Sequence, residues 1–151
     1  MNIPPEGPPQ RQKLPHAVPA WVHGDIIFFI TICCVPRGAN QLCTDQVSTV
    51  IWESVAFRQK RGDWFVHLWL LMPDHLHALI SFPKERDFTK VVANWKEMTT
   101  KKAPIRWQRD FFDHRLRSNE SFQEKTDYIR QNPVRKGLVT KQEDWKFVWT
   151  P

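Results

Sequence analysis

Two histidines separated by a single residue form the first candidate site in this chain, because such a pair can bind a metal ion. His75 and His77 lie in residues 64–82, WFVHLWLLMPDHLHALISF, an apolar run that predicts two strands joined at a turn over residues 72–75. Side chains alternate along a strand, so both imidazoles share one face, about 6–7 Å apart along it. Two strand histidines with this spacing also occur by chance in proteins without a metal. The residues predicted to face the core are Leu76, Ala78, Ile80 and Phe82.

A polar row on a late helix supplies the second set of residues that could do chemistry. Glu124, Tyr128 and Asn132 are spaced by four, which places them on one face of a helix, apart from its apolar residues. Tyr128 is the only tyrosine in the chain. Packing is an alternative role for Tyr128, and capping of the helix end is an alternative role for Asn132.

A tyrosine beside a bound metal ion suggests one specific reaction. A phenol with an ordinary pKa near 10 is a poor nucleophile at neutral pH. A divalent ion held by His75 and His77 would polarise a phosphodiester for its attack. That attack would leave DNA joined to Tyr128 as a phosphotyrosine and free a 3′-hydroxyl, so rejoining would need no nucleotide cofactor. The Asn132 amide oxygen, one helical turn away, is a candidate further ligand.

Composition favours one globular domain with an anionic partner. The 151 residues suit a single domain, predicted over residues 21–151, and residues 1–20 hold half of the prolines and predict a flexible arm. A net charge of +6 points first to nucleic acid. Three cysteines without Cys-x-x-Cys spacing indicate reduced thiols and no zinc ribbon. No apolar stretch is long enough for a membrane span and no signal peptide is evident, so a cytoplasmic location is expected.

The order of predicted elements indicates an α+β fold. Residues 25–35 predict a buried strand, and a helix capped by Thr44 or Asp45 should end at Gly62, with Phe57 at the edge of its apolar stripe. Residues 87–102 predict the second helix, and residues 110–116 predict a fourth strand. With the hairpin, this is the βαββαβ order of a ferredoxin-like sandwich, whose helices cover one face of an antiparallel sheet. The other face, with His75 and His77, should be free for a ligand.

The last helix follows that sandwich and carries the tyrosine. Ser121 stands at capping-box spacing from Glu124, and Ser118 is an alternative start. Pro133 disfavours helical geometry in the residue before it, so we expect the helix to end at Asn132.

Three blocks in this order resemble the one-tyrosine HUH transposases, where HUH denotes His, hydrophobic, His. The blocks are MPDHLH (residues 72–77), WQRDFFDH (residues 107–114) and YIRQNPVRKGLV (residues 128–139). The chain is most similar to the branch associated with repetitive extragenic palindromes (REP), over roughly residues 22–149. The resemblance implies a ferredoxin-like domain of a bacterial protein that cuts and rejoins single-stranded DNA near hairpins with Mg²⁺ or Mn²⁺. It also implies nucleoid association when bound to DNA.

Carried onto this chain, the resemblance assigns four roles. His75 and His77 would be metal ligands, Tyr128 the nucleophile, and Asn132 the further ligand in a place where other branches carry Gln. Imidazole ligands alone would suit Zn²⁺ or Mn²⁺ better than Mg²⁺, so the use of a hard metal is what the resemblance implies. The residues do not single out a proton acceptor for the phenol. The open candidates are His67, Asp74, Glu124 and a metal-bound water.

Basic residues near the tyrosine helix are the expected DNA contacts, because phosphate binding needs charge and reach. They are Arg115, Arg117, Arg130, Arg135 and Lys136. Asp113 and His114 would either position DNA or pack the sheet, and Trp107 would either stack a base or fill the core. A non-catalytic single-strand binder on a ferredoxin-like fold and a metal-dependent hydrolase with a water nucleophile are the alternatives. The sequence does not decide between a monomer and a homodimer.

Overall fold

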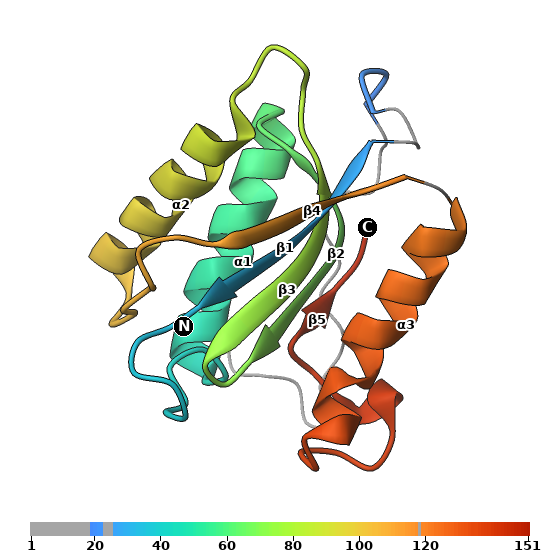
Figure 1. The fold of residues 1–151 in the computed structure, drawn as a ribbon. Coiled ribbons are helices and arrows are strands. Elements are labelled where there is room, and N and C mark those ends of the chain that lie inside the picture. Colours follow the sequence, from blue (N-terminus) through green and yellow to red (C-terminus); the bar gives the residue numbers. More distant parts are fainter. Residues whose placement is uncertain (1–18, 23–25, 118) are drawn as a thin grey trace.

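A five-stranded antiparallel sheet organises the chain, with helices on both of its faces (Figure 1). The computed structural model describes residues 19–22, 26–117 and 119–151. Nearly all of the arm predicted over residues 1–20 lies outside these described residues. The elements in chain order are β1 (Ile27–Cys33), α1 (Asp45–Arg61), β2 (Phe65–Met72), β3 (His75–Ser81), α2 (Phe88–Lys102), β4 (Phe112–Leu116), α3 (Asn119–Arg135), a 3-10 turn (Gln142–Asp144) and β5 (Val148–Trp149).

The strand order β4-β1-β3-β2-β5 confirms the predicted ferredoxin-like α+β fold. All neighbouring strands run antiparallel. The first four strands have the predicted places, whereas the two-residue β5, which pairs with β2, was not predicted. None of the helices in the described ranges is long and apolar enough to cross a membrane.

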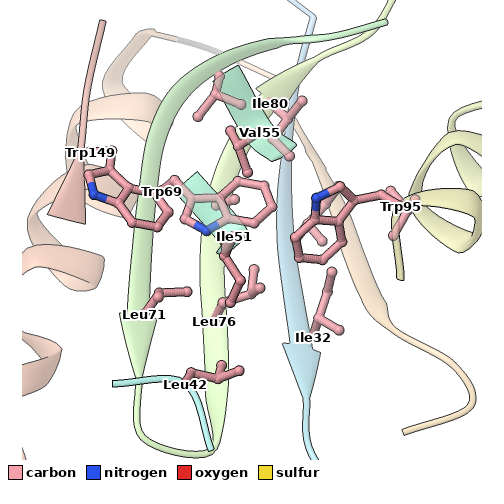
Figure 2. Close-up of a cluster of buried hydrophobic side chains, with 14 of the residues drawn as sticks. Ile32, Leu42, Ile51, Val55, Trp69, Leu71, Leu76, Ile80, Trp95 and Trp149 are labelled. Atoms are coloured by element: carbon pink, nitrogen blue, oxygen red, sulfur yellow. The ribbon is translucent and has the colours of Figure 1, made fainter. Parts of the chain in front are cut away.

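Helices α1 and α2 cover one face of the sheet and enclose the larger apolar core (Figures 1 and 2). Trp69 on β2 and Trp95 on α2 pack edge to face with ring centroids 5.1 Å apart. The Trp95 indole N–H donates to Ser54 Oγ at 2.9 Å, so this buried ring also satisfies its polar atom. The predicted core face of the hairpin is confirmed, since this cluster includes Leu76, Ala78, Ile80 and Phe82.

Capping residues set the ends of these two helices. Thr44 Oγ1 accepts from the backbone N–H of Val47 at the start of α1, and Gly62 ends this helix with φ +89°. Asp87 caps α2 in the same way by accepting from Thr89. Both predicted helices are thereby confirmed, but Phe57 lies outside the core, with 57% of its surface exposed.

The second face of the sheet is covered by α3 and the C-terminal segment, so the prediction of a free face is wrong. A separate apolar cluster fills this space, with Ile129 of α3 and Trp145 packed over the sheet. The reason is that β2 and β3 place large apolar side chains on this face as well, and water contact would cost about 1.5–3 kcal/mol for each. The sheet residues in this cluster are Ile27, Phe29, Leu68, Leu70, Met72, Leu79, Leu116 and Val148.

Helix α3 continues past Pro133 to Arg135, so the predicted end at Asn132 is wrong. A proline near the end of a helix removes only one backbone bond, and the turns after it are closed by others. The N–H of Gly137 donates to Val134 O at 3.0 Å, and that of Leu138 donates to Pro133 O at 2.9 Å. This pair of bonds, with Gly137 at φ +73°, forms a Schellman motif that ends the helix one turn later. Of the two predicted starts, Ser121 lies inside the helix and Ser118 lies outside the described residues.

Candidate active site

The two histidines lie side by side on β3, on the face that α3 covers. Both are buried, and their ring centroids are 4.8 Å apart with the planes at 77°. The sheet register sets His75 opposite Cys33 and His77 opposite Thr31. The alternation of strand side chains therefore brings the imidazoles together as predicted.

Hydrogen bonds fix both imidazole rings through the same nitrogen. His75 Nδ1 donates to Asp74 Oδ1 at 2.7 Å, and His77 Nδ1 lies 2.8 Å from Thr31 Oγ1, which can accept from it. Asp74 is itself held, because its Oδ2 accepts from Arg37 Nε at 2.9 Å and from the Gly38 N–H at 2.8 Å. Each ring is thus oriented with Nε2 as the atom left to bind a ligand.

Burial keeps the two imidazoles in the neutral form that binds metals. Burial is the main cause that lowers the pKa of His77 to about 3, and repulsion from the cations Arg135 and Arg37 adds to it. Burial also lowers the pKa of His75, against the opposing effect of Asp74. For Asp74, burial favours the neutral acid, but bonds from Arg37, His75 and Gly38 outweigh it and hold the pKa of that carboxyl well below its usual range.

Helix α3 brings Tyr128 and Asn132 of the same chain to the histidines. Asn132 is buried, and its Nδ2 lies 3.5 Å from His75 Nε2. The Tyr128 ring centroid is 6.4 Å from those of His77 and Phe29, and about half of the Tyr128 surface is exposed. Ile129 lies between these two residues in the chain and is completely buried, and it anchors this part of α3 to the sheet. The four predicted catalytic and metal-binding residues therefore lie together.

Two cations lie over the Tyr128 ring. The Arg135 guanidinium stacks 4.4 Å from the ring centroid, and its Nη2 donates to the backbone carbonyl oxygen of Tyr128 at 2.7 Å. Lys125 Nζ is 5.9 Å from the same centroid and 5.5 Å from that of Phe29. Such contacts stabilise an aromatic ring by about 0.5–1 kcal/mol at exposed sites. The phenol thus stands in a positively charged surrounding.

The predicted DNA contacts divide between this site and the edge of the sheet. Of the five, Arg135 contacts Tyr128, and Lys136 follows it at the same exposed helix end. Arg115 lies on β4 opposite Phe28, and Arg117 lies just after that strand, where both line an open groove. Arg130 is half-buried on α3.

The candidate proton acceptors lie in different parts of the fold. His67 Nε2 bonds to Ser81 Oγ at 2.8 Å, and Ser81 is four residues beyond His77, about 13 Å along β3. Asp74 is engaged by His75 and Arg37. Glu124 is exposed, one helical turn before Tyr128.

The block at residues 107–114 has mixed roles. Trp107 packs against the core, donating its indole N–H to Thr99 Oγ1 at 3.0 Å. Asp113 and His114 are both exposed on β4, where His114 pairs with Phe29. Trp107 therefore packs against the core, whereas Asp113 and His114 lie at the surface.

Sequence reasoning missed the residues that orient the site. Thr31 lies 46 positions from His77, and only the pairing of β1 with β3 brings them together. Arg37 reaches Asp74 from the loop after β1. The sequence predicts Asp74 only as a candidate proton acceptor, although its position in the turn next to His75 also indicates an orienting role.

The donor set fits a divalent ion that takes part of its ligands from outside the protein. Among the described residues, no three His, Cys, Asp or Glu side chains gather to hold a metal. Two oriented imidazoles and the Asn132 amide remain, which are neutral ligands accepted by Mn²⁺ and, less readily, by Mg²⁺. Such an incomplete set leaves positions for water and phosphate oxygens.

A ferredoxin-like sheet with a buried His-x-His pair, beside a helix that carries a tyrosine and a buried asparagine, places the chain in the transposase class. The chain belongs to the IS200-like transposases, since residues 28–132 match the family described as "Transposase IS200 like". It is similar to the REP-associated tyrosine transposase of Escherichia coli, with 27% identity over 111 residues that cover 72% of this chain and 67% of that protein.

Two further relatives agree with this assignment. A candidate REP-associated tyrosine transposase of Haemophilus influenzae is 29% identical over 94 residues, which cover 51% of this chain and 53% of that protein. The solved structure of a REP-associated tyrosine transposase bound to a REP hairpin has the same fold, with a TM-score of 0.72, 23% identity, and coverage of 89% of this chain and 82% of that one.

Proposed function

We propose that this protein cleaves and rejoins single-stranded DNA beside hairpin sequences, with Tyr128 as the nucleophile. The observation that carries the proposal is the meeting of Tyr128 and Asn132, one helical turn apart on α3, with the paired imidazoles on β3. A non-catalytic nucleic-acid binder has no need of a buried, fully oriented histidine pair beside an exposed phenol.

In the proposed reaction the Tyr128 phenolate oxygen attacks the phosphorus of one phosphodiester. A new P–O bond forms to the tyrosine, and the bond to the 3′ oxygen breaks, so the 5′ side of the DNA becomes a phosphotyrosine. The phenol proton leaves to solvent, and the departing 3′ oxygen takes up a proton. Attack by another 3′-hydroxyl reverses these steps and restores the phenol.

The surrounding residues prepare this step. Arg135 and Lys125 place positive charge beside the phenol and the path of a phosphate. Asp74 and Thr31 hold the imidazole rings with Nε2 directed away from their hydrogen bonds. His75, His77 and Asn132 would hold the divalent ion, which supplies polarisation of the phosphodiester and neutralisation of its developing charge.

The comparison with a REP-associated relative supports hairpin DNA as the substrate class, because that relative was solved with a REP hairpin bound. The charge of +6 on this chain favours the same kind of partner.

A covalent-adduct assay tests the proposal. The protein is incubated with Mn²⁺ and a hairpin oligonucleotide that carries a single-stranded flank, and adducts are detected by denaturing electrophoresis and mass spectrometry. Because Tyr128 is the only tyrosine, a phosphotyrosine on this chain identifies the nucleophile at once. Tyr128→Phe should bind the DNA and form no adduct.

Other outcomes separate the alternatives. Cleavage without an adduct would indicate hydrolysis by water, and binding without cleavage would indicate a binder. Either result with a folded protein and saturating Mn²⁺ contradicts the proposal. Phe57→Ala, which changes an exposed aromatic side chain on α1, is the control and should form adducts as the wild type does.

A further inference from the structure

We propose that Phe112, at the start of the edge strand β4, is a stacking platform for an unpaired base next to the phosphate that Tyr128 attacks. The inference deepens the proposed function and rests on it, because it names the part of the DNA that this surface binds: a single-stranded flank of the hairpin.

The sheet register places Phe112 in the same cross-strand row as a predicted metal ligand. Phe112 pairs with Thr31 of β1, and Thr31 pairs with His77 of β3 and bonds to its ring. Residues paired across strands share a face, and two strand spacings separate Phe112 from His77 by about 10 Å between backbones. The aromatic ring therefore stands on the site face, at the distance of a neighbouring nucleotide.

Phe112 is exposed, although another apolar residue on the same face of β4 is buried. On the same face of β4, Leu116 is 3% exposed and belongs to the apolar cluster under α3, whereas Phe112 is 62% exposed. Packing thus accounts for Leu116 and not for Phe112. An exposed phenylalanine provides a π face on which any base can stack.

The segment that leads into β4 is rigidly held, so the platform has a fixed position. The buried Lys96 ammonium donates to three backbone carbonyls, those of Gln108 at 2.6 Å, Arg109 at 3.1 Å and Asp110 at 3.3 Å. The Gln108 N–H donates to Cys33 O at 2.8 Å, which ties the same segment to β1. A backbone held in this way keeps the start of β4 in one position, which lowers the ordering cost of binding there.

Positive charge farther along the same edge strand suits a nucleic-acid strand. His114, Arg115, Leu116 and Arg117 line an open groove of about 400 Å³ along β4. His114 points to the site face, beside Phe29, while Arg115 lies on the other side of this outermost strand. A DNA strand that stacks a base on Phe112 can therefore run along β4 with its phosphates beside Arg115 and Arg117. A peptide strand added to the edge of β4 would pair with its backbone and would not need the Phe112 ring.

The experiment measures binding of two fluorescent oligonucleotides by anisotropy. One is a hairpin with a single-stranded flank and the other is the same hairpin without it. All proteins carry Tyr128→Phe so that no cleavage occurs. Phe112→Ala should weaken binding of the flanked hairpin by about 5- to 150-fold, the range found when an aromatic stacking partner is removed. Binding of the flankless hairpin should stay unchanged.

Matched variants test whether the loss of affinity comes from the aromatic ring. Phe112→Tyr keeps the ring and should restore binding, whereas Phe112→Leu keeps only apolar surface and should not. Phe57→Ala removes a comparably exposed phenylalanine, 57% exposed, from α1 on the opposite face and should have no effect. A 2-aminopurine placed at successive flank positions should change fluorescence at one position, and only when residue 112 is aromatic.

The inference is overturned if Phe112→Ala binds the flanked hairpin as the parent does, or if both hairpins lose affinity equally. Its failure is distinguishable from failure of the proposed function. If the protein with Tyr128 forms the adduct but Phe112→Ala binds normally, only the stacking platform is wrong. If Tyr128 forms no adduct while the flank-specific loss is present, the chemistry is wrong and the binding surface stands.

Discussion

Asp74→Asn should weaken metal binding by changing the proton position on His75 without removing any metal ligand. Asp74 accepts three hydrogen bonds: Oδ1 from His75 at 2.7 Å, and Oδ2 from Arg37 at 2.9 Å and Gly38 at 2.8 Å. An asparagine has one carbonyl oxygen to replace two carboxylate oxygens. Its amide group must therefore face either the two donors Arg37 and Gly38 or the single donor His75.

The structure indicates which orientation wins. Turning the NH₂ group toward Arg37 and Gly38 would break two hydrogen bonds. Turning it toward His75 leaves one conflict, which the imidazole relieves by moving its proton from Nδ1 to Nε2. In that tautomer Nε2 carries the proton, so His75 has no lone pair at the nitrogen that would bind the metal. Loss of such an orienting partner typically lowers metal affinity by about 10- to 100-fold.

Titration calorimetry with Mn²⁺ measures the affinity, and ¹⁵N chemical shifts of the imidazole report the tautomer. Asp45→Asn is the matched control, because the Asp45 side chain is 92% exposed and distant in sequence from the histidines, and it should bind Mn²⁺ as the wild type does. If folded Asp74→Asn binds Mn²⁺ with unchanged affinity, the assignment of Asp74 as the residue that orients His75 is refuted.

Three further outcomes are expected. Burial lowers the pKa of His67 to about 4, below the 6.5 of the unfolded chain. As pH falls from 6.5 toward 4, the unfolded chain binds a proton that the folded protein does not, so the fold loses stability. Urea unfolding of His67→Gln should therefore lose about 2 kcal/mol less stability than the wild type between pH 7 and 5, and an equal loss would contradict this. Burial raises the pKa of Cys34 and of Cys43 to about 12, so few of these thiols are in the reactive thiolate form. Iodoacetamide at pH 8 should therefore label both cysteines slowly in the folded protein and faster once it is unfolded. Equal labelling rates in the folded and unfolded protein, measured by mass spectrometry, would rule this out. Lys96→Met should lower the free energy of unfolding by about 2–3 kcal/mol and speed amide hydrogen exchange in β4, because the ammonium no longer binds the backbone carbonyls before this strand. Lys101→Met, which changes an exposed lysine of the same helix, should lower it by under about 0.5 kcal/mol. Comparable effects of the two substitutions would argue against Lys96 as the support of β4.

Local patterns predicted the elements of this fold well. Strand alternation placed His75 and His77 on one face, and spacing by four placed Tyr128 and Asn132 on one row of α3. Caps at Thr44 and Gly62 were also visible, since they depend only on neighbouring residues. These features follow from rules that act within a few positions of the chain.

Features that depend on packing between distant segments were not predictable in the same way. Nothing local indicates that Ile129 and Trp145 close the second face of the sheet, because their partners on β2 and β3 lie more than 40 positions away. The end of α3 is a local exception: the proline rule disfavours helical geometry before Pro133 but does not forbid it, and the bonds from Gly137 and Leu138 complete the helix. The link between Thr31 and His77 likewise exists only once β1 pairs with β3.

The complete burial of Ile129 limits what can move during strand exchange. This side chain stands between the proposed nucleophile and the proposed amide ligand in sequence, and lifting it from the sheet would expose a full isoleucine at about 1.5–3 kcal/mol. The buried Ile129 therefore keeps Tyr128 beside the histidines in most molecules, and an arrangement with α3 lifted from the sheet would be a minor state. If rejoining connects a different pair of ends from the pair that was cut, either a DNA end or α3 has to change position, and the burial of Ile129 adds this cost to any route that moves α3.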